Sequence, residues 1–395
     1  MSDPPTTRAA SVPEEFRVSQ PITYAAAGVD VEAGDRAVEL MRSSVARTHA
    51  TIESSGMRVL GGIGAFAGLV DVSVLRDYTR PVLATSTDGV GTKVAVAQAM
   101  DRHDTIGVDL VAMVVDDIVV CGARPVFMTD YIACGRVVPE RIAQIVAGIA
   151  AACEQAGCAL VGGETAEHPG LMGPSEYDLA GAAVGVVEAD ALLGPHRVRP
   201  GDVVVALASS GLHANGYSLV RRIVAEAGWT YDRQVAEFGC TLGEELLTPT
   251  RVYAADVVDL AGHLGDGLHA IAHVTGGGLA ANLARVLPQG VLARVDRSTW
   301  PPPPVFELVR RLGRVPMADL ERTVNLGVGM VAVLDPGSVD GALARLRERG
   351  IDSWVLGELV DPAMSPASAA HPGDVVQGAK GVQGGAVELT GAYAG

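Results

Sequence analysis

The segment TDGVGTK has the residue types of a phosphate-binding turn. A predicted strand ends there in the carboxylate of Asp88, and Gly89 and Gly91 let the following backbone N–H groups turn toward a ligand. Lys93 comes next, and Lys380 is the only other lysine among the 395 residues. An ammonium group binds phosphate as a point charge. We expect this turn to bind phosphate and Lys93 to be catalytic; a tight turn with a surface lysine is the alternative.

Three acids lie in one predicted helix, residues 105–122, among aliphatic neighbours. Asp109 and Asp116 are seven residues apart and share a face, and Asp117 is the next residue round. Each carboxylate must be paired, hydrogen-bonded or bound to metal, because burying it alone is too costly. The helix dipole explains Asp109 near the start but disfavours two acids near the end. Asp116 and Asp117 are therefore candidate ligands for Mg²⁺.

Glu164 ends the predicted strand ALVGGE in the same way that Asp88 ends its own strand. Ligands of α/β sheets gather at such strand ends. The available ligands are oxygens, without a cluster of cysteine and histidine, which favours Mg²⁺ over Zn²⁺. We expect Asp88, Asp117 and Glu164 to share one metal ion, with Asp116 as a further candidate.

Two glycine-containing loops in the second half of the chain could hold a phosphate. The loop SSGLHANGYS contains Asn215, and the loop VTGGG contains Gly276 and Gly277. Both precede predicted helices, whose N-terminal amides bind anions. His213 lies between small residues and could carry a proton near neutral pH.

A third glycine-rich segment, GGIGAF, occurs early in the chain. It lacks the βαβ context of a dinucleotide-binding fold, so a dehydrogenase is not indicated. We expect Gly61, Gly62 and Gly64 to form a mobile flap over a nucleotide.

The elements that must position these residues alternate along the chain. Strands are expected at 81–89, 158–164, 181–188, 201–210, 269–274 and 327–334, and helices at 34–50, 105–122, 139–157, 216–228, 279–287 and 340–350. Such interleaving predicts an α/β protein with α+β layers. The turn RVRPGD is a plausible boundary between two domains. We expect a flexible lead-in at 1–20, domains at 21–190 and 191–360, and a disordered low-complexity tail at 361–395.

Composition excludes several classes of protein. The 46 acidic and 30 basic residues give a net charge of −16, which argues against binding to nucleic acid or an anionic membrane. No uninterrupted apolar run is long enough to span a bilayer. The five cysteines form no CxxC pair, as is typical of free thiols in a reducing cytoplasm.

Taken in order, these segments resemble the phosphoribosylformylglycinamidine cyclo-ligase (AIR synthetase) family. The resemblance runs from about residue 20 to 360, and it rests on the motifs TYAAAGVD, GGIGAF, STDGVGTK, HDTIGVDLVAMVVDDIVVCGA, LVGGETAEHPG, SSGLHANGYSLVR, HVTGGG and NLGVGM. It implies a two-domain fold with an amino-terminal ATP-binding domain whose mixed sheet pairs in a homodimer. It also implies ATP and Mg²⁺, with formylglycinamidine ribonucleotide as substrate in purine biosynthesis.

The sequence departs from the family pattern in two places, and related activities share part of it. Asp116 stands where the family has asparagine, and Ala25 and Ala26 replace a Lys-Asp pair. Selenophosphate synthetase carries a reactive cysteine or selenocysteine in its early glycine-rich loop, whereas the first cysteine here is Cys121. Thiamine-monophosphate kinase lacks the SSGxHxNGYSLVR motif. A nucleotide-binding regulatory protein without turnover is the alternative outside catalysis.

Overall fold

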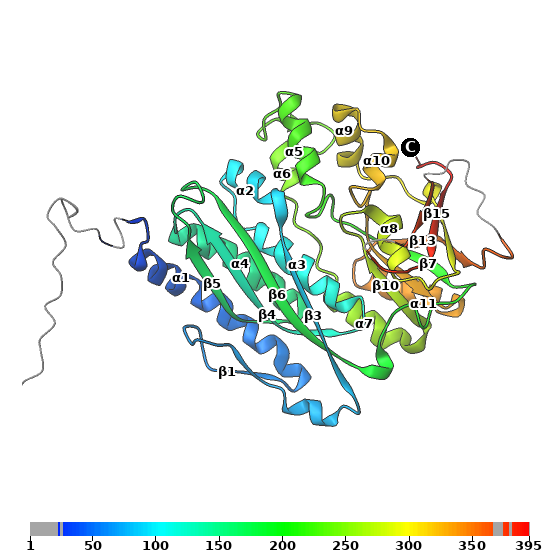
Figure 1. Ribbon diagram of the computed structural model, residues 1–395, viewed down its shortest axis with the longest axis horizontal. Helices are drawn as coiled ribbons and strands as arrows, with labels where there is room; N and C mark the ends of the chain where they lie inside the picture. Colours follow the sequence, from blue (N-terminus) through cyan, green and yellow to red (C-terminus); the bar gives the residue numbers. More distant parts are fainter. Residues whose placement is uncertain (1–22, 24–26, 366–373, 379–380, 395) are drawn as a thin grey trace, which may run out of the picture.

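The computed structural model describes Thr23 and residues 27–365, 374–378 and 381–394, which form two units of sheet and helix (Figure 1). The amino-terminal elements are α1 (Val31–His49), η3 (Ala50–Ser55), β1 (Arg58–Leu60), β2 (Leu69–Asp71), η4 (Ser73–Asp77), β3 (Pro81–Gly89), η5 (Gly91–Lys93), α2 (Val94–Met100), α3 (Ile106–Val119), β4 (Arg124–Cys134), α4 (Pro139–Ala156), β5 (Ala159–Glu167), β6 (Tyr177–Glu188) and η6 (Ala189–Ala191). The carboxy-terminal elements are β7 (Val203–Ala208), α5 (Tyr217–Glu226), β8 (Gln234–Val235), β9 (Cys240–Thr241), α6 (Leu242–Leu246), α7 (Ala254–Leu264), η7 (Gly265–Gly267), β10 (Leu268–His273), α8 (Gly278–Arg285), β11 (Leu292–Asp296), η8 (Arg297–Thr299), α9 (Pro304–Gly313), α10 (Met317–Glu321), β12 (Val328–Leu334), η9 (Pro336–Ser338), α11 (Val339–Glu348), β13 (Ser353–Val360), β14 (Val375–Gln377) and β15 (Ala386–Thr390).

The amino-terminal sheet is mixed and has one open face. Its strand order is β3-β6-β4-β5, with β4 and β5 parallel and the other pairs antiparallel. Alternate residues of β3 and β6 differ in burial, as expected when helices cover only one face. Helix α3 packs on β3 and β6, and α4 packs between α3 and α1. The opposite face exposes Leu83 (65%) and Tyr131 (41%).

The carboxy-terminal sheet has seven strands in the order β10-β12-β7-β13-β11-β15-β14. Strands β10 and β12 are buried along their whole length, which explains their runs of alanine, valine and isoleucine. Helices α7 and α11 pack on each other, and α8 contacts β10, β14 and β15. This sheet positions the two glycine loops, because β7 leads into residues 209–216 and β10 leads into residues 274–277.

Helix α3 lies where the two units meet. It contacts the first sheet, α4 and also α7 of the second unit, so nearly all its residues are buried. A helix that is apolar on every side is expected to be a buried core helix. No helix in the described part of the chain is long and apolar enough to cross a membrane.

Part of the tail at 361–395 that was predicted to be disordered belongs to the carboxy-terminal sheet. Strand β15 pairs in parallel with β11, and β14 pairs with β15. The fully buried Glu388 of β15 accepts a hydrogen bond from Arg294 at 3.0 Å. The low-complexity composition hid this strand, whose VEL core is only three residues long. The expected lead-in, and the Ala25–Ala26 departure, lie outside the described residues.

Every strand and helix expected from the sequence is present, with ends shifted by a few residues. The expectation omitted β4, which carries an acid of the site described below, and it omitted β11, β13 and several helices, α7 and α9 among them. The first sheet ends at Glu188 and the second begins at Val203. The connecting segment bonds to both units, through Leu193 N to Cys121 O (3.0 Å) and Gly194 N to His269 O (2.9 Å).

Candidate active site

The residues predicted to act together fall into two groups within one chain. The first group surrounds a pocket between α1, the glycine flap and β5 at one edge of the amino-terminal sheet. The second group lies at the other edge, where β3 and α3 meet the carboxy-terminal unit. The expectation of one shared site is therefore not met by a single chain in this conformation.

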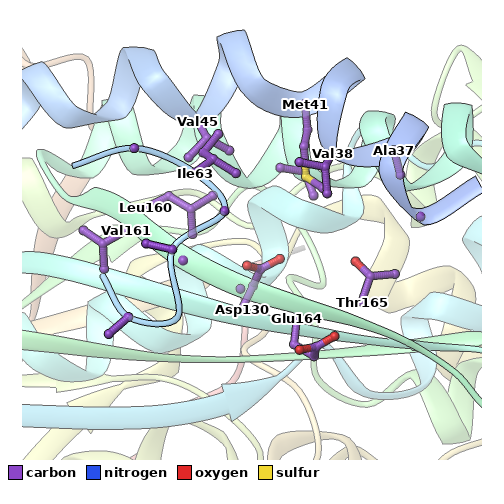
Figure 2. A pocket seen from close by; sticks show the side chains of 18 residues that line it. Ala37, Val38, Met41, Val45, Ile63, Asp130, Leu160, Val161, Glu164 and Thr165 are labelled. Carbon is purple, nitrogen blue, oxygen red and sulfur yellow. The ribbon is translucent and has the colours of Figure 1, made fainter. Parts of the chain in front are cut away.

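The pocket has a volume of about 290 Å³ (Figure 2). Apolar side chains form its upper wall on α1 and part of its floor on β5, and the flap from Gly62 to Ala67 closes one side; the apolar lining includes Ala37, Val38, Met41, Val45, Ile63 and Leu160. Gly61 and Gly64 have φ of 95° and 103°, a backbone region that side-chain-bearing residues rarely adopt. Phe66, at the end of the flap, is fully exposed.

Asp130, on β4, was missed by the sequence reasoning. Its carboxylate points toward α1 and lines the pocket (Figure 2). Burial raises the pKa of Asp130 to about 7, and its own backbone N–H is its only hydrogen-bond donor among the described residues. A buried carboxylate with so few hydrogen-bond donors would be stabilised in its charged form by a bound cation. The signal was present in the sequence as one acid inside the apolar strand FMTDYIAC.

Glu164 also lines the pocket, but it does not share a metal ion with Asp88. The strand register places Asp88 beside Gly181, Gly181 beside Asp130, and Asp130 beside Gly163. Three strand spacings therefore separate β3 from β5, which is about 14 Å. Glu164 is one register position further along β5, so it lies on the opposite face of the sheet, as Figure 2 also shows.

The predicted three-carboxylate metal site is accordingly not formed. In the described ranges no three carboxylate, imidazole or thiol side chains lie close enough to hold one metal ion. The prediction rested on Asp88 and Glu164 ending their strands in the same way, but β6 and β4 lie between those two strands. Residue spacing alone does not reveal strand order.

The turn after β3 lies at the domain boundary. The Gly89 N–H donates to Asp88 Oδ1 at 2.8 Å, and Gly91, with φ of 71°, begins the short helix η5. Thr92 Oγ1 is 3.0 Å from Ser218 Oγ of α5. The turn therefore faces the carboxy-terminal unit.

Lys93 has no exposed surface in this structure. Its ammonium group donates to Asp109 Oδ1 (2.8 Å), to the His213 carbonyl (2.9 Å) and to the Thr248 carbonyl (2.6 Å). All three hydrogens are used, so this arrangement gives no support to the expected contact with phosphate. The scarcity of lysine correctly marked a special position, but it did not distinguish a ligand contact from a structural one.

The two buried acids of α3 also bond to the second unit. Asp109 Oδ1 accepts from the backbone N–H (2.8 Å) and hydroxyl (2.6 Å) of Thr250. The Asp116 carboxylate accepts from the Tyr253 N–H at 3.1 and 3.2 Å, and burial raises the pKa of Asp116 to about 7. The Asp116 carboxylate is already hydrogen-bonded within the protein, which argues against Asp116 as an additional metal ligand.

Asp117 forms a pair with His273, a residue that the sequence reasoning left unassigned. His273 Nδ1 lies 2.8 Å from Asp117 Oδ1, and its Nε2 is buried without a partner among the described residues. Burial alone lowers the pKa of His273, but the bond to Asp117 and the nearby charges of Asp116 and Asp88 outweigh it and raise the pKa. The Asp117 side chain is 41% exposed.

His213 is held in a strained and neutral state. Its φ is 61°, and its Nε2 accepts from the Ser210 N–H at 3.1 Å. Burial lowers the pKa of His213 well below its usual value, and His273 and Lys93 lower it further. The neutral ring therefore carries its proton on Nδ1, which is buried without a partner among the described residues. This group can donate a hydrogen bond but is poorly suited to carry protons.

The two glycine loops are in contact with each other. Asn215 Oδ1 accepts from the Gly276 N–H at 3.0 Å, and Asn215 Nδ2 approaches Met113 Sδ of α3 at 3.7 Å. Gly277 has φ of 109° and immediately precedes α8. The loops thus lie together beside His213 and His273, as their predicted common role requires.

Comparison with known proteins defines the class. Residues 67–187 match the model of AIR synthase related protein, N-terminal domain, and residues 199–365 match that of the C-terminal domain. Among solved structures, thiamine-monophosphate kinase from Stenotrophomonas maltophilia K279a aligns with a TM-score of 0.61 at 20% identity, covering 88% of this chain and 96% of that one. Hydrogenase maturation protein HypE in complex with ATP aligns with a TM-score of 0.53 at 20% identity, covering 83% and 88%. The chain is an AIR synthase related protein by fold.

Sequence relatives narrow the class. The chain is 46% identical to phosphoribosylformylglycinamidine cyclo-ligase of Pseudothermotoga lettingae, covering 86% of this chain and 97% of that protein. It is 49% identical to the enzyme of the same name from Anaeromyxobacter sp. (strain Fw109-5), covering 86% and 96%. The chain belongs to the phosphoribosylformylglycinamidine cyclo-ligase family, which confirms the resemblance seen in its motifs.

Proposed function

We propose that this chain catalyses the ATP-dependent ring closure of formylglycinamidine ribonucleotide to 5-aminoimidazole ribonucleotide, with release of ADP and phosphate, in purine biosynthesis. The observation that carries this proposal is the 46–49% identity to cyclo-ligases over 86% of the chain. The likeness to thiamine-monophosphate kinase is at 20% identity and supports the fold alone. The five cysteines are all free, which suits the cytoplasm, where we propose that the enzyme works.

ATP is assigned to the pocket between α1, the flap and β5. Its apolar wall suits a nucleoside base, and the glycines of the flap leave open space above it, since nothing lies within 4 Å of a Cβ built on Gly61, Gly62 or Gly64. Asp130 would hold a magnesium ion there, whereas the side chain of Glu164 points to the other face of the sheet. The ion neutralises charge on the triphosphate; the chain itself supplies orientation and exclusion of water.

We assign the substrate to the two glycine loops, which lie where the two units meet. We assign its phosphate to the loops containing Asn215, Gly276 and Gly277, whose backbone amides precede helices and carry no net charge; the Gly276 N–H, which donates to Asn215 Oδ1 here, would have to change partner. Asp88 and Asp117 stay our proposed cation ligands on this side of the sheet. His213 donates from Nδ1 to an oxygen of the substrate.

The chemistry proceeds in two balanced steps. The formyl oxygen of the substrate attacks the γ-phosphorus of ATP, and ADP leaves. The amine nitrogen then attacks the activated carbon, phosphate leaves and the nitrogen loses a proton. We assign that proton to His273 Nε2, because Asp117 fixes the ring through Nδ1. His273 thus replaces His213 as the proposed proton carrier.

A homodimer would unite the two groups of residues. They lie at opposite edges of one four-stranded sheet whose open face exposes Leu83 and Tyr131. A second copy packed on that face would bring the ATP pocket of one chain toward the glycine loops of the other. We propose this pairing as the active form.

Turnover of formylglycinamidine ribonucleotide with ATP and Mg²⁺ tests the function. The aminoimidazole product is detected by diazo coupling, and ADP and phosphate are measured in the same reaction. We expect equal amounts of all three. ATP-dependent phosphorylation of thiamine monophosphate, without aminoimidazole formation, would instead support the kinase. Nucleotide binding without any ADP release would support a regulatory protein.

A further inference from the structure

The bonds of Lys93 join three separate segments. The ammonium group connects Asp109 on α3 of the amino-terminal unit to the carbonyls of His213 and Thr248 in the carboxy-terminal unit. Lys93 and Asp109 both have fully buried side chains. Burial lowers the pKa of Lys93 and raises the pKa of Asp109, and their mutual attraction opposes both changes. The pair is therefore stable only while both partners remain in place.

The carbonyl that Lys93 binds belongs to the strained residue of the substrate loop. His213 has its positive φ of 61° within residues 209–216, between Ser210 and Asn215. A non-glycine residue keeps this conformation only where its surroundings impose it. The Lys93 bond holds the His213 carbonyl, and the Ser210 N–H holds the His213 ring. These two bonds fix the orientation of the His213 ring and of both its nitrogens.

The neighbouring segment 248–251 is fixed by the same pair. Asp109 binds the backbone and the hydroxyl of Thr250, and Lys93 binds the Thr248 carbonyl. That segment in turn supports the substrate loop, because Ser210 Oγ donates to the Pro249 carbonyl (2.7 Å) and accepts from the Arg251 N–H (3.1 Å). The loop 209–216 is thus held directly and through a second segment.

We infer that Lys93 and Asp109 form an interdomain clasp that keeps the loop 209–216 in its substrate-binding conformation, so Lys93 is a positioning residue and does not act on the reacting phosphate. This inference rests on the proposed function. The clasp acts on the binding of formylglycinamidine ribonucleotide, because that loop holds His213 and Asn215. The ATP pocket lies at the other edge of the sheet and is not linked to the clasp by these bonds.

Steady-state kinetics of full-length variants tests the inference. Lys93→Met leaves the Asp109 carboxylate buried and unpaired, so we expect a lower melting temperature than that of the wild type. Lys93→Met combined with Asp109→Leu removes both charges and should recover part of that loss. In the double variant we expect KM for formylglycinamidine ribonucleotide to rise at least about tenfold, while KM for ATP and kcat change less than about threefold. Arg102→Met, which removes an exposed ion pair with Asp104, is the matched control.

Thr250→Val keeps Lys93 and removes only one donor to Asp109, so it remains informative if the double variant does not fold. It should raise the same KM by a smaller factor. A fall in kcat of about 100-fold or more in a folded Lys93→Met/Asp109→Leu protein, with KM unchanged, would show that Lys93 acts on the phosphate. Unchanged kinetics in every variant would also overturn the clasp. Absence of turnover in the wild type would instead contradict the proposed function.

Discussion

At the scale of single residues, burial decides what each charged group can do. Asp109, Asp116 and Asp130 are all poorly solvated acids, yet the first two accept hydrogen bonds from the second unit and only Asp130 is left facing a pocket. A sequence pattern identifies such acids as unusual. Their partners determine whether they bind a ligand or join two units.

Replacing Asp130 with asparagine tests its assignment to the cation. The amide keeps the shape but loses the charge, so we expect KM for ATP·Mg²⁺ to rise at least about tenfold, within the range for weakened metal sites. The melting temperature should not fall, because a poorly compensated charge is removed. Tyr131→Phe, at the adjacent position, controls for general disturbance of β4. Unchanged dependence of the rate on Mg²⁺ would refute the assignment.

His103 should make stability depend on pH. Its nitrogens bond to Tyr177 Oη (2.9 Å) and Asp101 Oδ1 (3.1 Å), and burial lowers its pKa below the ordinary 6.5 despite the Asp101 bond. The native state therefore resists protonation, while the unfolded chain accepts a proton as the pH falls below 6.5. We expect the melting temperature to drop between pH 7.5 and 5.5 by less in His103→Gln than in the wild type. Equal drops, measured by calorimetry, would contradict this.

At the scale of elements, strand order controls which residues meet. β3 carries Asp88 and β5 carries Glu164, but β6 and β4 separate the two strands. Strand order also joins segments that are far apart in the chain. The short strand β15, inside a low-complexity segment, pairs in parallel with β11.

β15 should be needed for stability. Val387 on this strand is fully buried, whereas Val382 in the same segment is 44% exposed. We expect Val387→Asp to lower the free energy of unfolding by about 3 kcal/mol or more, because it buries a charge without a partner. Val382→Asp should change it by less than about 0.5 kcal/mol. Denaturant titration measures both, and equal effects would mean that the strand contributes little.

At the scale of the whole molecule, one face of the amino-terminal sheet is not covered by helices and exposes apolar side chains. Leu83, on the edge strand β3 that pairs with β6, is 65% exposed. If a second copy covers this face, Leu83→Arg should turn a dimer into a monomer and lower turnover. Met364→Arg, at a residue 85% exposed in the other unit, should do neither. Sedimentation velocity at assay concentrations measures the mass, and a fully active wild-type monomer would refute the pairing.

The local sequence determined most of the longer elements, the family and the positions of the glycine loops. Glycines at required turns and apolar periodicity are short-range signals, which depend on neighbouring residues only, and the special position of Lys93 followed from the composition of the chain. Tertiary structure decided the rest, because strand order and domain packing arise from contacts between distant residues. These contacts separated Asp88 from Glu164, turned Lys93 and Asp109 toward the second unit, paired His273 with Asp117, and placed Asp130 in the pocket.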